Sequence, residues 1–166
     1  MPDLGFIPLH HKKIDMKKLL FVFVALIAFA GYSTAQIDPV SWSFSAKKVN
    51  DKVYDVYLTA KLNPGWHIYS QTQTADAIAL PTEFSFTNNP LMTLAGKVKE
   101  VGKLEKFYDK TLKASANQYS KTVSFVQRVN LKSNVKTTLA GVVEYQTCDD
   151  KKCLPPKKVP FKIPVG

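Results

Sequence analysis

Cysteine and histidine are scarce in this sequence of 166 residues. The two cysteines, Cys148 and Cys153, are too few for a disulfide-dense miniprotein or a four-cysteine zinc module. Beyond residue 35 the one histidine is His67, and neither GxSxG nor HExxH occurs, which argues against a hydrolase. Cys148, Cys153 and His67 together are one ligand short of a closed zinc site, so we predict no metal.

Glycine is scarce as well. The seven glycines form neither GxxxxGK[ST] nor GxGxxG, so we expect no phosphate-cradling fold and no cofactor. Acidic residues are fewer than basic ones, 13 against 23, and the formal net charge is +10. The lysines are scattered along predicted strands, which favours a solvated basic surface over a nucleic-acid site. We therefore predict no nucleic-acid partner.

The apolar run at residues 19–30 is 12 residues long, short of the roughly 20 needed to span a bilayer. Lys17 and Lys18 precede this run, and Ser33 and Ala35 follow it at the small-residue positions of a cleavage site. This order of features is typical of a signal peptide. An uncleaved membrane anchor is the alternative.

We therefore predict a leader over residues 1–35, with the true start at Met16, a signal peptide over 16–35 and a mature chain of 36–166. No cysteine follows the cleavage site, so a lipoprotein anchor has no acceptor there. The mature protein is expected in the periplasm or otherwise secreted, without stable membrane insertion after cleavage.

Apolar and polar residues alternate with period two through most of the mature chain, which indicates half-buried strands. The clearest case is 53–62, where Tyr54, Val56 and Leu58 share one face and Asp55 lies on the other. In 158–165 two prolines lack the donor that a sheet ladder needs, so we place this strand at a sheet edge. The other predicted strands are 40–44, 82–86, 121–129 and 137–147.

Seven or eight short strands in roughly 131 residues, without a convincing amphipathic helix, predict one all-β domain. We expect an immunoglobulin-like antiparallel β-sandwich over 36–166. Residues 104–119 do not fit this pattern clearly, and we read them as a long loop with a turn of helix. Trp42 and Trp66 are expected in the core.

Cys148 and Cys153 are four residues apart beside a strand end, and in an exported protein such a pair is expected to join across a hairpin-like turn. A loop this short stabilises a fold by only about 2 kcal/mol. Strained or exposed disulfides are the reducible ones. From the residues alone, both a redox-active pair and a structural staple remain open.

Three segments resemble one known family. Val143-Glu-Tyr-Gln-Thr-Cys148 through Cys153-Leu-Pro-Pro156 resembles the signature of the amino-terminal periplasmic domain of the thiol:disulfide interchange protein DsbD, the disulfide bond corrector domain. Gly65-Trp-His-Ile-Tyr69 is similar to an aromatic segment of that family, and Glu105-Lys-Phe-Tyr-Asp109 is similar to its cap loop. The cysteine spacing is one residue shorter than in the fused members of the family.

The resemblance implies a sandwich whose cysteine pair passes reducing equivalents from a thioredoxin-like or membrane electron-conducting protein to exported protein disulfides. It implies that Cys153 attacks the partner and Cys148 resolves the mixed disulfide. Phe107 and Tyr108 would cover the pair, and His67 and Tyr69 would lie near it. Since this sequence has no membrane or thioredoxin-like domain after 166, we expect a separate donor.

Other interpretations stay open beside this one. Phe107 and Tyr108 could be core residues, and His67 could be a half-exposed strand residue. The five lysines at the end of the chain could guard a sheet edge or steer an acidic partner. They are Lys151, Lys152, Lys157, Lys158 and Lys162. The alternative function is a non-catalytic binding or adhesion sandwich with a structural disulfide.

Overall fold

The computed structural model describes Lys17 and residues 38–110 and 113–166. The described residues form eleven strands. They are β1 (Val40–Lys48), β2 (Val53–Leu62), β3 (His67–Tyr69), β4 (Glu83–Phe86), β5 (Met92–Gly102), β6 (Glu105–Asp109), β7 (Ala114–Ser120), β8 (Thr122–Leu131), β9 (Thr137–Tyr145), β10 (Thr147–Cys148) and β11 (Lys157–Val165). The predicted leader lies outside the described residues, apart from Lys17. No helix among the described residues has the length and apolarity to cross a membrane.

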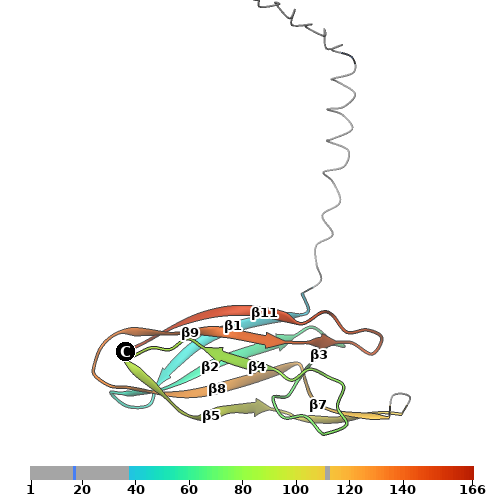
Figure 1. The fold of residues 1–166 in the computed structure, drawn as a ribbon, viewed down its shortest axis with the longest axis horizontal. Coiled ribbons are helices and arrows are strands. Elements are labelled where there is room, and N and C mark those ends of the chain that lie inside the picture. The colour runs from blue at the N-terminus through green and yellow to red at the C-terminus, as the bar shows by residue number, and fades with distance from the viewer. Residues whose placement is uncertain (1–16, 18–37, 111–112) are drawn as a thin grey trace, which may run out of the picture. The chain divides into compact units, whose positions relative to one another are not determined.

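Three antiparallel sheets organise these strands, with the orders β1-β2-β8-β5, β11-β9-β4 and β10-β3-β7-β6. The first two sheets form the two layers of the domain (Figure 1). Aromatic side chains cross between these layers: Trp42 of β1 packs on Tyr145 of β9, and Phe84 of β4 packs on Phe125 of β8. The predicted all-β, immunoglobulin-like antiparallel sandwich is confirmed.

Strand β2 shows why the alternation predicts the core. Tyr54, Val56, Leu58, Ala60 and Leu62 are all buried, and they pack against buried residues of β8, β9 and β11. Burial of an aliphatic side chain of this size stabilises the fold by roughly 1.5–3 kcal/mol. Trp42 is half-buried and packs against this core, whereas Trp66 is half-buried and lies outside it.

The proline-containing strand β11 lies at the edge of its sheet, as predicted. Pro160 and Pro164 are exposed, while Phe161, Ile163 and Val165 are buried. Their side chains alternate, so the two prolines share the face of β11 opposite the buried residues.

The expectation of a loop with a helical turn at 104–119 is wrong, because strands β6 and β7 pair here with Phe107 opposite Ala116. The β7 sequence ASANQYS is rich in small polar residues of low strand propensity. Its second ladder, with β3, supplies neighbours on both sides, so tertiary pairing overrides a weak local preference.

The predicted strand 137–147 is two strands in the structure. Strand β9 ends at Tyr145 in the sheet with β11 and β4, and after Gln146 the chain continues as β10, which pairs with β3 in a different sheet. This change of sheet carries Cys148 away from the core layers and into the β10-β3-β7-β6 sheet.

Candidate functional site

Cys148 and Cys153 form a disulfide that closes a tight turn, with their Cα atoms 4.0 Å apart. The Asp149 amide donates to the Lys152 carbonyl at 2.9 Å, and the Leu154 amide donates to the Thr147 carbonyl at 2.9 Å. These bonds extend the hairpin on both sides of the disulfide. The predicted pairing across a hairpin-like turn is therefore confirmed.

The Asp149 side chain organises the turn between the two cysteines. Its Oδ1 accepts from the amides of Lys151 at 2.8 Å and Lys152 at 2.7 Å. These two amides lower the pKa of the Asp149 carboxyl from its ordinary value. The aspartate is therefore held ionised, and it acts as the local cap of the turn.

The two sulfur-bearing residues have opposite environments. Cys148 on β10 is only 2% exposed, whereas Cys153, beyond the turn, is exposed. Thiol–disulfide exchange requires an incoming sulfur to reach one sulfur of the pair. In this arrangement only Cys153 is presented to solvent.

Strand β3 places two further predicted residues beside the disulfide. His67 lies directly opposite Cys148 in the β3–β10 ladder. The imidazole Nε2 of His67 is 3.3 Å from the hydroxyl of Tyr69, and the two rings meet edge to face. Burial lowers the pKa of His67, against smaller opposing contributions from Asp150, Asp149 and Glu105. Burial raises the pKa of Tyr69.

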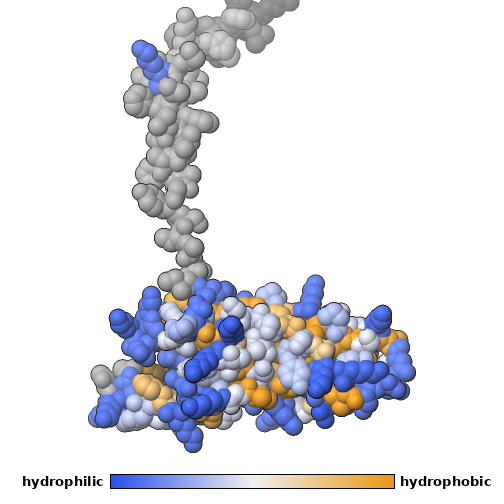
Figure 2. All heavy atoms as spheres, turned by 180° about the vertical axis from the view of Figure 1, so that it is seen from behind, coloured by the Kyte–Doolittle hydropathy of each residue, from blue (hydrophilic) through white to orange (hydrophobic). Residues whose placement is uncertain are grey.

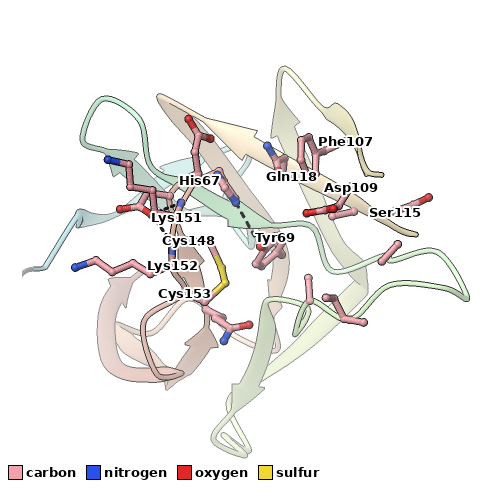
Figure 3. A pocket seen from close by; sticks show the side chains of 17 residues that line it. His67, Tyr69, Phe107, Asp109, Ser115, Gln118, Cys148, Lys151, Lys152 and Cys153 are labelled. Atoms are coloured by element: carbon pink, nitrogen blue, oxygen red, sulfur yellow. Dashed lines mark hydrogen bonds between the residues drawn. A yellow bond between two sulfur atoms is a disulfide. The ribbon is translucent and has the colours of Figure 1, made fainter. Parts of the chain in front are cut away.

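A cavity of about 410 Å³ opens over the disulfide (Figure 3). Its wall includes Cys148, Cys153, His67, Tyr69 and Phe107. Three segments distant in the sequence therefore meet at one site: the aromatic segment of β3, the β6–β7 hairpin and the cysteine turn.

Phe107 and Tyr108 take different positions, although both are about half exposed. They are neighbours on β6, so their side chains leave opposite faces of the strand. Phe107 lines the cavity over the disulfide, and Tyr108 is not part of its wall. Tyr108 lines an adjoining depression of about 240 Å³ with Thr74 and Asn117, and Phe107 lines both this depression and the cavity.

Sequence patterns did not single out several residues of the cavity wall, among them Ile78, Gln118 and Gln146. Gln146 Oε1 accepts from the Leu80 amide at 3.4 Å, and its Nε2 donates to the Leu154 carbonyl at 3.3 Å. It therefore ties the 78–80 segment to the cysteine turn. Gln146 lies two residues before Cys148, within the family-like motif, and this position is the sequence feature that could have identified it. We find no such sequence feature for Ile78 or Gln118.

The lysines near the chain end divide into two groups. Lys157 forms an ion pair with Asp38, and Lys158 lies 3.2 Å from Glu144. Lys151 and Lys152 are exposed on the cysteine turn and line the cavity. Within residues 38–110 and 113–166, no three His, Cys, Asp or Glu side chains are placed to hold a metal ion.

The fold is similar to two solved amino-terminal domains. The amino-terminal domain of DsbD from Neisseria meningitidis, in its reduced form, matches 75% of this chain and 84% of its own at 16% identity and a TM-score of 0.50. The amino-terminal periplasmic domain of ScsB from Proteus mirabilis matches 78% of this chain and 48% of its own at 18% identity and a TM-score of 0.53.

No curated protein sequence shows significant similarity to the chain. The family model described as "Thiol:disulfide interchange protein DsbD, N-terminal" matches residues 35–163. This match covers all of the sandwich except the last residues of β11, and it includes the disulfide with its exposed and buried cysteines. The chain therefore belongs to the family of DsbD amino-terminal domains, whose chemistry is thiol–disulfide exchange.

Proposed function

We propose that this protein relays reducing equivalents outside the cytoplasm through Cys148 and Cys153, from a thioredoxin-like or membrane electron-conducting donor to exported protein disulfides. The observation that carries the proposal is the pairing of one exposed and one buried cysteine at the wall of a cavity. A purely structural disulfide needs neither an accessible sulfur nor a cavity beside it.

The reaction begins with the reduced pair. The Cys153 thiolate attacks one sulfur of the partner disulfide, forms a mixed disulfide and releases the other partner sulfur as a thiolate. The Cys148 sulfur then attacks Cys153 and displaces the second partner thiolate. The partner gains two electrons and two protons, and the Cys148–Cys153 disulfide forms. A reduced donor dithiol restores the pair by the reverse sequence.

The surroundings of Cys153 supply the surface on which a partner docks. Phe107 offers a half-exposed apolar ring at the cavity, and Lys151 and Lys152 on the cysteine turn add positive charge to the cavity wall. An acidic rim on the partner would be attracted to these lysines, which raises the rate of encounter more than the final affinity. We assign Phe107 as the cap of the unengaged pair.

The roles of the two sulfurs are tested by trapping. Cys148→Ser leaves the attacking sulfur without a resolving one, so non-reducing gels of the native host should show a covalent complex through Cys153. Cys153→Ser should trap little, because Cys148 is buried. Stronger trapping by Cys153→Ser would reverse the assignment. No trapping by either variant, with a potential well below about −300 mV, would favour the structural disulfide.

Export is part of the proposal, with residues 16–35 removed before Gln36. The basic residues, the apolar run and the small residues near Ala35 support it. Intact-mass analysis of the extracytoplasmic protein tests the cleavage site. A mature amino terminus at residue 1 or at Met16 would contradict it.

A further inference from the structure

The inference concerns His67, the ladder partner of Cys148. Side chains of directly opposed residues in an antiparallel pair leave the same face, with Cβ atoms about 4.5–5.5 Å apart. Both residues line the cavity, and Figure 3 shows His67 with its contact to Tyr69 drawn. An imidazole therefore stands within reach of the buried sulfur.

The buried sulfur needs a base in the second half of the exchange reaction. Cys148 has to attack as a thiolate, yet burial of a thiol disfavours the charged form. Cys153 meets solvent and can lose its proton to water or buffer. The proton on Cys148 requires an acceptor inside the site.

The groups around His67 come from four elements. Tyr69 lies on the same strand, Glu105 on β6, and the charged residues Asp149, Asp150, Lys151 and Lys152 on the turn that follows β10. Opposite His67 on β7 is the neutral Ser120, whose hydroxyl donates to Glu105 at 2.8 Å.

Two of these groups are poor proton acceptors. Tyr69 stays protonated because burial raises its pKa, and Asp149 is held ionised by two backbone amides that lower its pKa. The His67 imidazole is neutral at neutral pH, because burial lowers its pKa, and His67 is the residue directly opposite Cys148 in the ladder. A general base is most effective when its pKa lies near the working pH.

We propose that His67 accepts the proton of Cys148 during resolution of the mixed disulfide, an inference that rests on the exchange function proposed above. In the tautomer that carries the proton on Nε2, this nitrogen donates to the Tyr69 hydroxyl and Nδ1 keeps its lone pair for the proton from Cys148. The Cys148 sulfur bonds to Cys153 as the bond from Cys153 to the partner sulfur breaks. The electron pair of that bond goes to the partner sulfur, which receives the proton from the imidazolium through solvent in the cavity.

The test follows the two sulfur steps separately. Reduced protein is mixed with dithiobis(nitrobenzoate), which releases one coloured thiolate when Cys153 attacks and a second when Cys148 resolves the mixed disulfide. The first phase depends on reagent concentration and the second does not. In His67→Gln the second phase should be slowed about 100-fold at neutral pH, the low end of general-base contributions, with the first phase nearly unchanged. In His67→Ala, added imidazole should restore the second phase, because the site opens into the cavity.

An unchanged second phase in His67→Gln, or equal slowing of both phases, would overturn the inference, because equal slowing marks a structural disturbance. The wild-type protein gives an independent check if the variants fail to fold. Its second-phase rate should fall on acidification with a midpoint below about 6.5, the ordinary pKa of histidine. A rate that rises tenfold per pH unit without a plateau would overturn the inference. Because this reagent needs no protein partner, failure to trap partners in the host leaves the result standing.

Discussion

At the scale of single residues, the site depends on two cysteines of identical chemistry in different environments. Cys148 is buried on β10, while Cys153 is exposed after a four-residue turn capped by Asp149. The difference in accessibility means that an incoming sulfur can reach Cys153, whereas Cys148 can react only with the sulfur of Cys153.

Phe107 and Tyr108 make the cap testable at the level of one side chain. Phe107→Ala should speed the reaction of the reduced protein with a small alkylating agent, because Phe107 lines the cavity over the cysteines. Tyr108→Ala is the matched control and should change the rate less, since Tyr108 does not line the cavity over the cysteines. Mass spectrometry of quenched samples measures both rates. Equal acceleration by the two variants would show that the whole hairpin, and not the Phe107 ring, controls access.

Glu100 joins three segments through its carboxylate. Oε2 accepts from the hydroxyls of Ser70 at 2.8 Å and Tyr119 at 2.7 Å, and Oε1 accepts from the Gln71 amide at 2.7 Å. Tyr119 is buried, and its burial together with the bond to Glu100 raises its pKa far above the ordinary value. The network connects β5 and β7 to the end of β3, which carries His67 and Tyr69.

This network predicts the alkaline limit of stability. The raised pKa of Tyr119 means that the folded state favours the neutral phenol, so its contribution is complete below the unfolded pKa of about 10 and is lost as pH rises above it. Tyr119→Phe should cost about 1 kcal/mol at neutral pH and flatten the alkaline decline. Urea unfolding at several pH values measures both effects, with Tyr108→Phe, a change at an exposed side chain, as the control. If the unfolding free energy of Tyr119→Phe falls as steeply at alkaline pH as that of the wild type, groups other than Tyr119 cause the decline.

At the scale of elements, the change of sheet after Tyr145 builds the site. One continuous segment pairs with β11 and β4 as β9 and then with β3 as β10. The first part anchors the segment in the core through Leu139, Val143 and Tyr145, and the second part delivers Cys148 to the cavity.

Gly141 is the residue of β9 that permits its close packing. A Cβ there would overlap the Ser85 carbonyl and would lie 2.6 Å from Cζ of Phe161. Gly141→Ala should therefore lower the unfolding free energy by about 2–3 kcal/mol, the upper part of the usual range for overpacking, because backbone and an aromatic ring both stand in the way. Gly96→Ala offers a contrast, because the site is open but φ is +73°, so only the backbone cost of about 1 kcal/mol applies. Equal losses in urea unfolding would contradict the packing argument at Gly141.

At the scale of the whole molecule, the disulfide lies outside the buried hydrophobic cluster, although Ile68 and Tyr119 of the site's sheet belong to that cluster. The buried cluster between the two main layers includes Val56, Phe125, Val143 and Phe161 and does not include Cys148. Basic residues are spread over the surface, and Figure 2 shows hydrophilic side chains interspersed with apolar ones on one face. The ion pairs of Lys157 and Lys158 engage two of the lysines near the end of the chain.

This separation predicts that the protein can cycle between redox states without unfolding. Reduction of the Cys148–Cys153 disulfide should lower the unfolding free energy by about 2 kcal/mol, the value for so short a closed loop. Urea unfolding with and without a dithiol reductant measures the difference, and the double variant with both cysteines replaced by serine should behave like the reduced protein. Loss of the folded state on reduction would identify the disulfide as structural.

Much of the sandwich could be predicted because strand periodicity is local. Alternation in 53–62 identifies the buried face of β2 residue by residue, and the prolines of β11 identify an edge. Strand β5 escaped prediction because it is an edge strand with few buried residues and a bulge between Ala95 and Lys99. A bulge shifts the alternation, so period two is lost along the strand.

The sequence by itself determined the strand-rich class, the pairing of Cys148 with Cys153 across a short turn, and the likeness of three segments to one family. Only the tertiary structure decided that Cys148 is buried and Cys153 exposed, that His67 faces Cys148, and that Phe107 reaches the cavity while Tyr108 does not. The physical reason is that these features depend on ladders between strands distant in the sequence, such as β3 with β10 and β6 with β7 in the sheet that forms the site. Local alternation predicts which residues share a face of a strand, and pairing between distant strands determines which residues that face packs against.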